Sequence, residues 1–185
     1  MSQVETRASI QTVRGLIQAA DRLDERFVLH CFTYDSPSVT TDLLEVASKT
    51  EGKARFVIYA DYDCLNKMEA MKERLGQINQ CTRAYVKIAE GIGCGPAYRE
   101  VGGTWSGPGK HNNTCARVGP FSLAGSANLS TSTGGNHEWG HIVWLNAAGM
   151  SAVDQHELRV SAKAWPFGEK KGARKGVRPT DWDES

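Results

Sequence analysis

Two overlapping groups of residues between positions 110 and 145 have the types and spacing that chemistry requires. The first group is His111, then a Gly-Ser-Ala-Asn segment that supplies Ser126 and Asn128, and then an Asn-His-Glu segment that ends at Glu138. A neutral imidazole can form a temporary bond to phosphorus, which divides one difficult displacement at a phosphodiester into two easier ones. A carboxylate can orient that imidazole, and neutral donors can bind the phosphoryl oxygens. Residues of these types are therefore able, if they meet in the fold, to cleave a phosphodiester without a metal ion.

The second group is the sequence His-Glu-Trp-Gly-His at 137–141, which matches a zinc-peptidase signature. Two histidines four residues apart bind one zinc ion only on a helix, where they share a face. Gly140 and the β-branched and aromatic residues after it favour a strand, on which His137 and His141 would stand roughly 13 Å apart. A zinc peptidase is therefore the weaker hypothesis, and we expect no metal at these histidines.

The composition is that of an ordinary soluble globular protein. With 185 residues, 40% of them hydrophobic and 23% charged, the chain is long enough for one domain with a substantial core. Its net charge of +1 gives no overall field that favours nucleic acid or a membrane surface. Its five cysteines include no C-x-x-C pair, which favours buried thiols in a reducing compartment. Because no apolar run approaches the ~18 residues of a membrane span, and the N-terminal segment is not apolar, we expect a soluble, cytoplasmic protein.

Hydrophobic periodicity predicts the elements that position these residues. Apolar residues recur every three or four positions between Ile10 and Ala20, as on one face of a helix, whereas short apolar runs such as RFVIYAD are rich in strand formers. We predict helices at 8–23, from 37 to before Gly52, at 63–78 and at 150–164, strands at 26–32, 55–61, 84–89 and 138–145, and a hairpin of 111–118 with 121–126. The last helix is expected to bury Leu158. Strands alternating with helices of this length indicate an α/β protein.

Two further segments have distinctive compositions. The stretch 90–109 is rich in glycine and leads into the hairpin, and Trp105 within it is a candidate for stacking on a substrate or for packing on its own domain. After Pro166 the chain becomes glycine-rich and basic, as in a solvated extension or a nucleic-acid arm. We therefore predict a domain at 1–165 and a flexible basic tail at 166–185.

The first group of residues resembles the active-site motif of the phospholipase D superfamily, in particular its small single-motif, nuclease-like members. The family motif is H-x-K-x4-D, followed by G-S-x-N and by an acidic residue in an N-x-E setting, and His111, Ser126, Asn128 and Glu138 match it at the family's spacing. The likeness extends over about 8–165, because the segment FVLHCFTYDSPSVTTDLL also resembles the family's first strand and the helix after it, and RFVIYAD resembles its second strand. It implies an α/β sandwich with a mixed central sheet and helices on both faces. It also implies a homodimer, in which the partner's histidine protonates the leaving oxygen, and no cofactor.

Two motif positions differ from the family pattern. Asn113 stands where the motif has lysine, and Val118 stands where it has aspartate. Loss of a cation beside the transferring phosphoryl group could cost several kcal/mol, since removing even one neutral donor costs ~3 to 4 kcal/mol. Strand alternation puts Arg117 on the same face as His111 and Asn113, so Arg117 could supply part of the missing charge. Three interpretations stay open: an inactive relative that binds without cutting, an enzyme with a relocated cation, and a deliberate substitution that traps substrate.

The preferred hypothesis is a metal-independent phosphodiesterase that works as a homodimer. Nuclease activity is favoured over lipase activity because no membrane-binding element is visible in the sequence. The alternatives are a catalytically inactive phospholipase D-like protein that binds nucleic acid or serves as an assembly subunit, and, less favoured, the zinc metallopeptidase. The expected partners are a second copy of the chain and a nucleic acid or other phosphodiester, without a membrane. The candidate catalytic residues are His111, Asn113, Ser126, Asn128 and Glu138, and the candidate substrate-binding residues are Arg117 and Trp105.

Overall fold

A computed structural model describes residues 2–90, 114–130 and 140–171, with side chains from residue 9 onward. Its elements lie along the chain in a largely alternating order. They are α1 (Ser2–Leu23), β1 (Phe27–Cys31), α2 (Pro37–Ala47), β2 (Phe56–Asp61), α3 (Tyr62–Lys67), α4 (Glu69–Ile78), β3 (Ala84–Ala89), β4 (Thr114–Val118), β5 (Phe121–Gly125), β6 (Gly140–Trp144), α6 (Ala147–Lys163) and β7 (Trp165–Pro166). None of the described helices has the length and apolarity needed to cross a bilayer.

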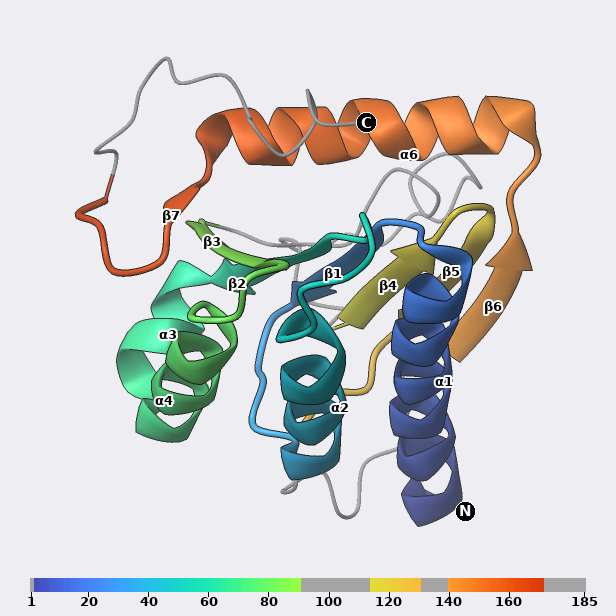
Figure 1. The fold of residues 1–185 in the computed structure, drawn as a ribbon. Coiled ribbons are helices and arrows are strands. Elements are labelled where there is room, and N and C mark those ends of the chain that lie inside the picture. Colours follow the sequence, from blue (N-terminus) through green and yellow to red (C-terminus); the bar gives the residue numbers. More distant parts are fainter. Residues whose placement is uncertain (1, 91–113, 131–139, 172–185) are drawn as a thin grey trace.

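The described strands form one mixed sheet of seven strands in the order β6-β5-β4-β1-β2-β3-β7. β1, β2 and β3 are parallel to one another, and the remaining neighbours are antiparallel. The helices α1 to α4 cover one face of this sheet, and α6 crosses the other face (Figure 1). The prediction of a mixed central sheet with helices on both faces is confirmed.

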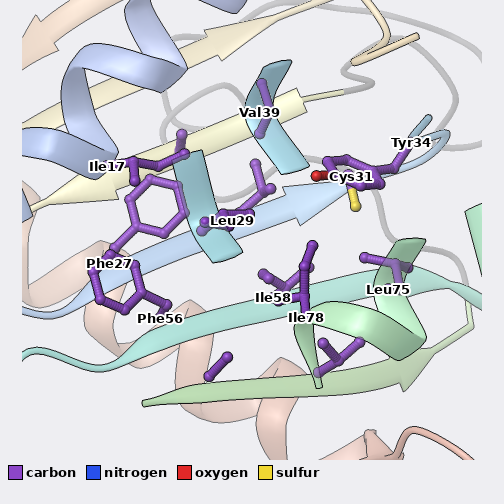
Figure 2. Packing of buried hydrophobic residues seen from close by; sticks show 14 of the residues in the cluster. Ile17, Phe27, Leu29, Cys31, Tyr34, Val39, Phe56, Ile58, Leu75 and Ile78 are labelled. Atoms are coloured by element: carbon purple, nitrogen blue, oxygen red, sulfur yellow. The ribbon is translucent and has the colours of Figure 1, made fainter. Parts of the chain in front are cut away.

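The main core lies between the sheet and the helices α1, α2 and α4. The helical spacing of apolar residues explains it: Val13, Ile17 and Ala20 of α1 are fully buried, as are Val39, Leu43 and Val46 of α2. Figure 2 shows Ile17 and Val39 pointing toward the inward-facing residues of β1 and β2. A much smaller apolar cluster lies on the other face, where α6 contributes Val160 and Ala164.

Two predicted details differ from the structure. The helix predicted at 63–78 is two helices, because Met68 adopts an extended conformation with φ −123° and ψ 97° and packs against the core. Leu158 is 37% exposed, so its predicted burial is wrong; α6 instead turns Glu157 and Ser161 inward. Near the predicted domain boundary, Pro166 pairs with Lys87 and the following amide donates to the Val86 carbonyl at 3.0 Å. The boundary at residue 165 and the flexible tail stay predictions.

Candidate active site at the carboxyl edge of the sheet

The strand ends next to the candidate motif lie together at one edge of the sheet. The parallel strands β1, β2 and β3 finish at this edge, at Cys31, Asp61 and Ala89. β4 begins there, because Thr114 pairs with Cys31, and β5 ends there, because Gly125 pairs with Thr114. Ligands of open α/β sheets bind outside the carboxyl ends of the parallel strands. We call this side of the sheet the carboxyl edge and take it as the candidate site.

A buried hydrogen bond brings the two halves of the predicted motif together at the carboxyl edge. Thr114 Oγ1 donates to the carbonyl oxygen of Ala127 at 2.7 Å, and both residues are about 1% exposed. Thr114 directly follows Asn113, and Ala127 directly precedes Asn128. The chain leaving the His-x-Asn segment is therefore held against the Gly-Ser-Ala-Asn turn.

The loop after β1 is joined to the same turn by its backbone. A parallel bridge pairs Tyr34 with Leu129, and the amides of Asp35 and Ser36 donate to the Leu129 carbonyl at 2.8 and 3.0 Å. Ser36 then caps α2, its Oγ accepting from the Val39 amide at 3.4 Å. The amino end of α2, with the positive end of its helix dipole, consequently lies at the carboxyl edge.

The predicted site residues are only partly within the described chain. Ser126 and Asn128 lie at the carboxyl edge, directly after β5, and both are partly exposed. The other predicted catalytic residues and the predicted stacking residue lie outside the described residues: His111, Asn113, Glu138 and Trp105. Their roles stay predictions.

Thr33 is a residue of this edge that sequence reasoning missed. It follows β1 and directly precedes the bridged residue Tyr34, as Asn128 directly precedes Leu129. Thr33 Oγ1 and Asn128 Oδ1 are both buried, and within the described part of the chain neither has a hydrogen-bond partner. A polar residue just beyond a central parallel strand was the available signal. The pairing with Leu129 was not visible, because it joins segments far apart in the sequence.

Arg117 lies away from Ser126 and Asn128. It is three residues along β4 from Thr114, roughly 10 Å toward the opposite edge, and only 8% of its side chain is exposed. Its Nε and Nη2 donate to the two carboxylate oxygens of Glu157 at 2.9 and 2.8 Å, and Nη2 also donates to Asp154 at 2.7 Å. Although burial opposes its charge, these carboxylates raise the pKa of Arg117 above its ordinary value. Binding of a phosphoryl group by Arg117 stays a prediction, and it requires the side chain to leave α6.

His30 lies in the same layer, between the sheet and α6. Its ring is buried, packs edge-on against Tyr59 with centroids 4.9 Å apart, and lies 5.9 Å from the ring of His156. Burial, together with the charges of His156 and Arg117, lowers the pKa of His30 from 6.5 to about 3. The imidazole is therefore neutral in the folded protein across the physiological pH range.

This neutral histidine predicts a loss of stability in mild acid. The unfolded chain binds a proton at His30 near pH 6.5, whereas the folded protein binds it only near pH 3, so the free energy of unfolding falls as the pH drops from 6.5. The slope attributable to His30 approaches about 1.4 kcal/mol per pH unit. Urea unfolding at a series of pH values should show a shallower slope for His30→Phe than for the wild type. His141→Phe, at an exposed position of β6, is the control and should keep the slope of the wild type. Equal slopes for the wild type and His30→Phe would contradict a neutral, buried His30.

The second histidine of the HExxH sequence lies on a strand, as predicted. His141 belongs to β6, which pairs only with β5 among the described strands and is exposed along its length. His137 and Glu138 lie outside the described residues. Among the described residues, no three histidine, cysteine or acidic side chains are grouped as a metal site requires.

Comparison with known proteins identifies the fold but no close relative. No protein-family model and no curated protein sequence matches the chain. Among solved structures, NucT from Helicobacter pylori is similar with a TM-score of 0.65 and 15% identity, over 89% of this chain and 94% of that one. Nuc from Salmonella typhimurium, a phospholipase D family member, is similar with a TM-score of 0.59 and 11% identity, over 83% of this chain and 89% of that one. With the mixed seven-stranded sheet and its flanking helices, these similarities show that the chain has a phospholipase D-like fold.

Proposed function

We propose that the protein is a metal-independent phosphodiesterase of the nuclease type, with a histidine nucleophile at a homodimer interface. The observation that supports it best is the Thr114–Ala127 hydrogen bond. This bond holds the residue after Asn113 against the residue before Asn128, at the edge where an α/β sheet binds its ligands. A phospholipase D-like fold and the spacing of the sequence motif support the same site.

The proposed residues divide the reaction into two displacements. His111 attacks phosphorus, a P–N bond forms, and the P–O bond to the leaving group breaks while the partner's histidine donates a proton to the leaving oxygen. Water then attacks phosphorus, the partner's histidine takes a proton from that water, and the P–N bond breaks to release His111. Glu138 orients the His111 imidazole, and Ser126 and Asn128 donate to the non-bridging oxygens.

The geometry of the sheet limits how two copies can share one site. Both carboxyl edges must face each other, so the two-fold axis must pass close to that edge. Antiparallel pairing of two β6 strands about Ile142 would instead place the two Gly140 ends, and with them the two sites, at opposite ends of the pair. The proposed dimer therefore uses the carboxyl edge, although Ile142 and Trp144 of β6 are 66% and 67% exposed.

The position of Lys171 supports nucleic acid as the substrate. Lys171 forms an ion pair with Glu90, directly after β3, and its Nζ lies 5.2 Å from the ring centroid of Tyr62, directly after β2. Both contacts are at the carboxyl edge, and Arg174, Lys175 and Arg178 follow Lys171 in the sequence. A basic residue at this edge, followed by further basic residues in the sequence, suits the phosphate backbone of a nucleic acid.

Cleavage in the presence of a metal chelator tests this proposal. The protein should cut a fluorescently labelled single- or double-stranded oligonucleotide at the same rate with and without excess EDTA, because no step uses a metal. A phosphatidylcholine vesicle serves as the lipid substrate and should be cleaved much more slowly. Loss of nucleic-acid cleavage on chelation would refute the metal-independent mechanism, and a monomer by analytical ultracentrifugation would refute the shared site.

A second function is favoured by one specific observation, the asparagine at position 113. A chain that lacks the motif lysine can keep the fold and the neutral donors while losing the charge that stabilises the transition state. Such a protein would bind nucleic acid without cleaving it.

A further inference from the structure

We propose that Thr33 is a positioning residue for the candidate site: its hydroxyl donates to Asn128 Oδ1 when a phosphoryl oxygen binds, and so directs the Asn128 NH2 group toward that oxygen. The inference rests on the proposed function, because Asn128 is one of its phosphoryl-oxygen donors. It adds a residue of the loop after β1, outside the sequence motif.

The backbone places the two side chains at neighbouring positions. Tyr34 and Leu129 form a parallel bridge between two segments of the same chain, whose backbones lie about 4.8 Å apart. Thr33 and Asn128 directly precede the two bridged residues. Two amides of the loop after β1 donate to the Leu129 carbonyl, which fixes the register. Tyr34 and Leu129 are fully buried, and Figure 2 shows Tyr34 among the core residues at the end of β1.

The chemistry of the two oxygens is complementary. Thr33 Oγ1 carries a proton that it can donate, and Asn128 Oδ1 can only accept. Both atoms are buried without a hydrogen-bond partner in the described chain, and such an atom loses hydration without compensation. One hydrogen bond between them satisfies both atoms. It also leaves the two N–H groups of Asn128 available for a ligand oxygen.

Ligand binding is the step that closes this bond. Hydrogen bonds at catalytic sites are often long before a ligand binds and shorten when it does. An ordered water molecule between the two oxygens would satisfy them in another way and would give Thr33 no role in binding. The two arrangements predict different effects of removing the hydroxyl.

A double-mutant cycle distinguishes the direct hydrogen bond between Thr33 and Asn128 from a bridging water molecule. Affinity for a fluorescein-labelled single-stranded oligonucleotide is measured for the wild type, Thr33→Val, Asn128→Ala and the double variant, with inorganic phosphate as competitor. Thr33→Val should weaken binding about 3- to 10-fold, the effect of one hydrogen bond. In the Asn128→Ala background the same change should have less than a twofold effect, because Thr33 acts through Asn128. Thr33→Ser should restore most of the affinity.

The melting temperature of the ligand-free protein distinguishes a positioning role of Thr33 from a purely structural one. A purely structural role would lower the melting temperature and the affinity together. Thr33→Val removes an unpaired buried hydroxyl, so its melting temperature should be equal to or above that of the wild type while its affinity falls. Thr41→Val is the matched control, because Thr41 lies on the exposed face of α2, and it should leave affinity unchanged. Asn128→Ser replaces Asn128→Ala as the background if the alanine variant does not fold.

Each outcome has one consequence for the proposal. Equal losses in both backgrounds, an unchanged affinity of Thr33→Val, or a parallel fall in melting temperature and affinity would overturn it. Binding by the wild type without cleavage would refute phosphodiesterase activity, but the binding cycle would still decide the role of Thr33. If the wild type binds neither oligonucleotide nor phosphate, both proposals are wrong.

Discussion

Replacing Glu157 with alanine is expected to lower the free energy of unfolding by about 3 to 5 kcal/mol. The side chain is 3% exposed, and its carboxylate accepts two hydrogen bonds from Arg117 and one, at 2.7 Å, from Arg26. Its removal leaves the Arg117 guanidinium buried, with Asp154 as its remaining anionic partner in the described chain. An under-compensated buried charge is among the most destabilising changes a single substitution can make.

Chemical denaturation measures this effect, and two further variants define its cause. Glu157→Gln keeps the shape and one acceptor oxygen, so it should lose less stability than the alanine variant. Glu45→Ala, on the exposed face of α2, is the matched control and should change stability by less than about 0.5 kcal/mol. A loss below about 1 kcal/mol for Glu157→Ala would show that water enters the layer under α6 and solvates Arg117.

The same residue shows why part of the fold could be predicted from the sequence and part could not. Apolar runs identify β1, β2 and β3, and apolar spacing identifies the buried faces of α1 and α2, because hydrophobic burial leaves a local pattern. The inward face of α6 leaves no such pattern. It is set by ion pairs of Glu157 with Arg26 and Arg117, which are distant in sequence. The apolar pattern therefore predicts burial of Leu158, whereas the structure buries Glu157.

The candidate site also contains residues that the sequence could indicate and one that it could not. Ser126 and Asn128 could be proposed as site residues because their spacing from His111 follows the motif. Thr33 could not, because its proximity to Asn128 depends on the Tyr34–Leu129 bridge, a contact between two loops. The break between α3 and α4 was missed for a related reason: the extended conformation of Met68 reflects its packing against the core, whereas its local sequence is compatible with a continuous helix.

The proposed nucleophile and the missing motif cation make the largest predicted changes in activity. If the wild type cleaves phosphodiesters, His111→Ala should reduce kcat at least about 10³-fold, because the covalent route is lost and only binding and positioning remain. A wild-type rate retained by His111→Ala would refute the proposed nucleophile.

Restoring the motif cation is expected to have the opposite effect. Asn113→Lys should raise kcat by about 10²- to 10³-fold, the range expected for one group that stabilises charge in the transition state. Asn112→Lys adds the same charge at the neighbouring position of the sequence, which is not the lysine position of the H-x-K motif, so it should leave kcat nearly unchanged. Equal gains from both substitutions would mean that added charge only improves binding of a polyanion. No gain from Asn113→Lys in an active enzyme would mean that another cation already occupies the position, and combination with Arg117→Gln would show whether Arg117 supplies it.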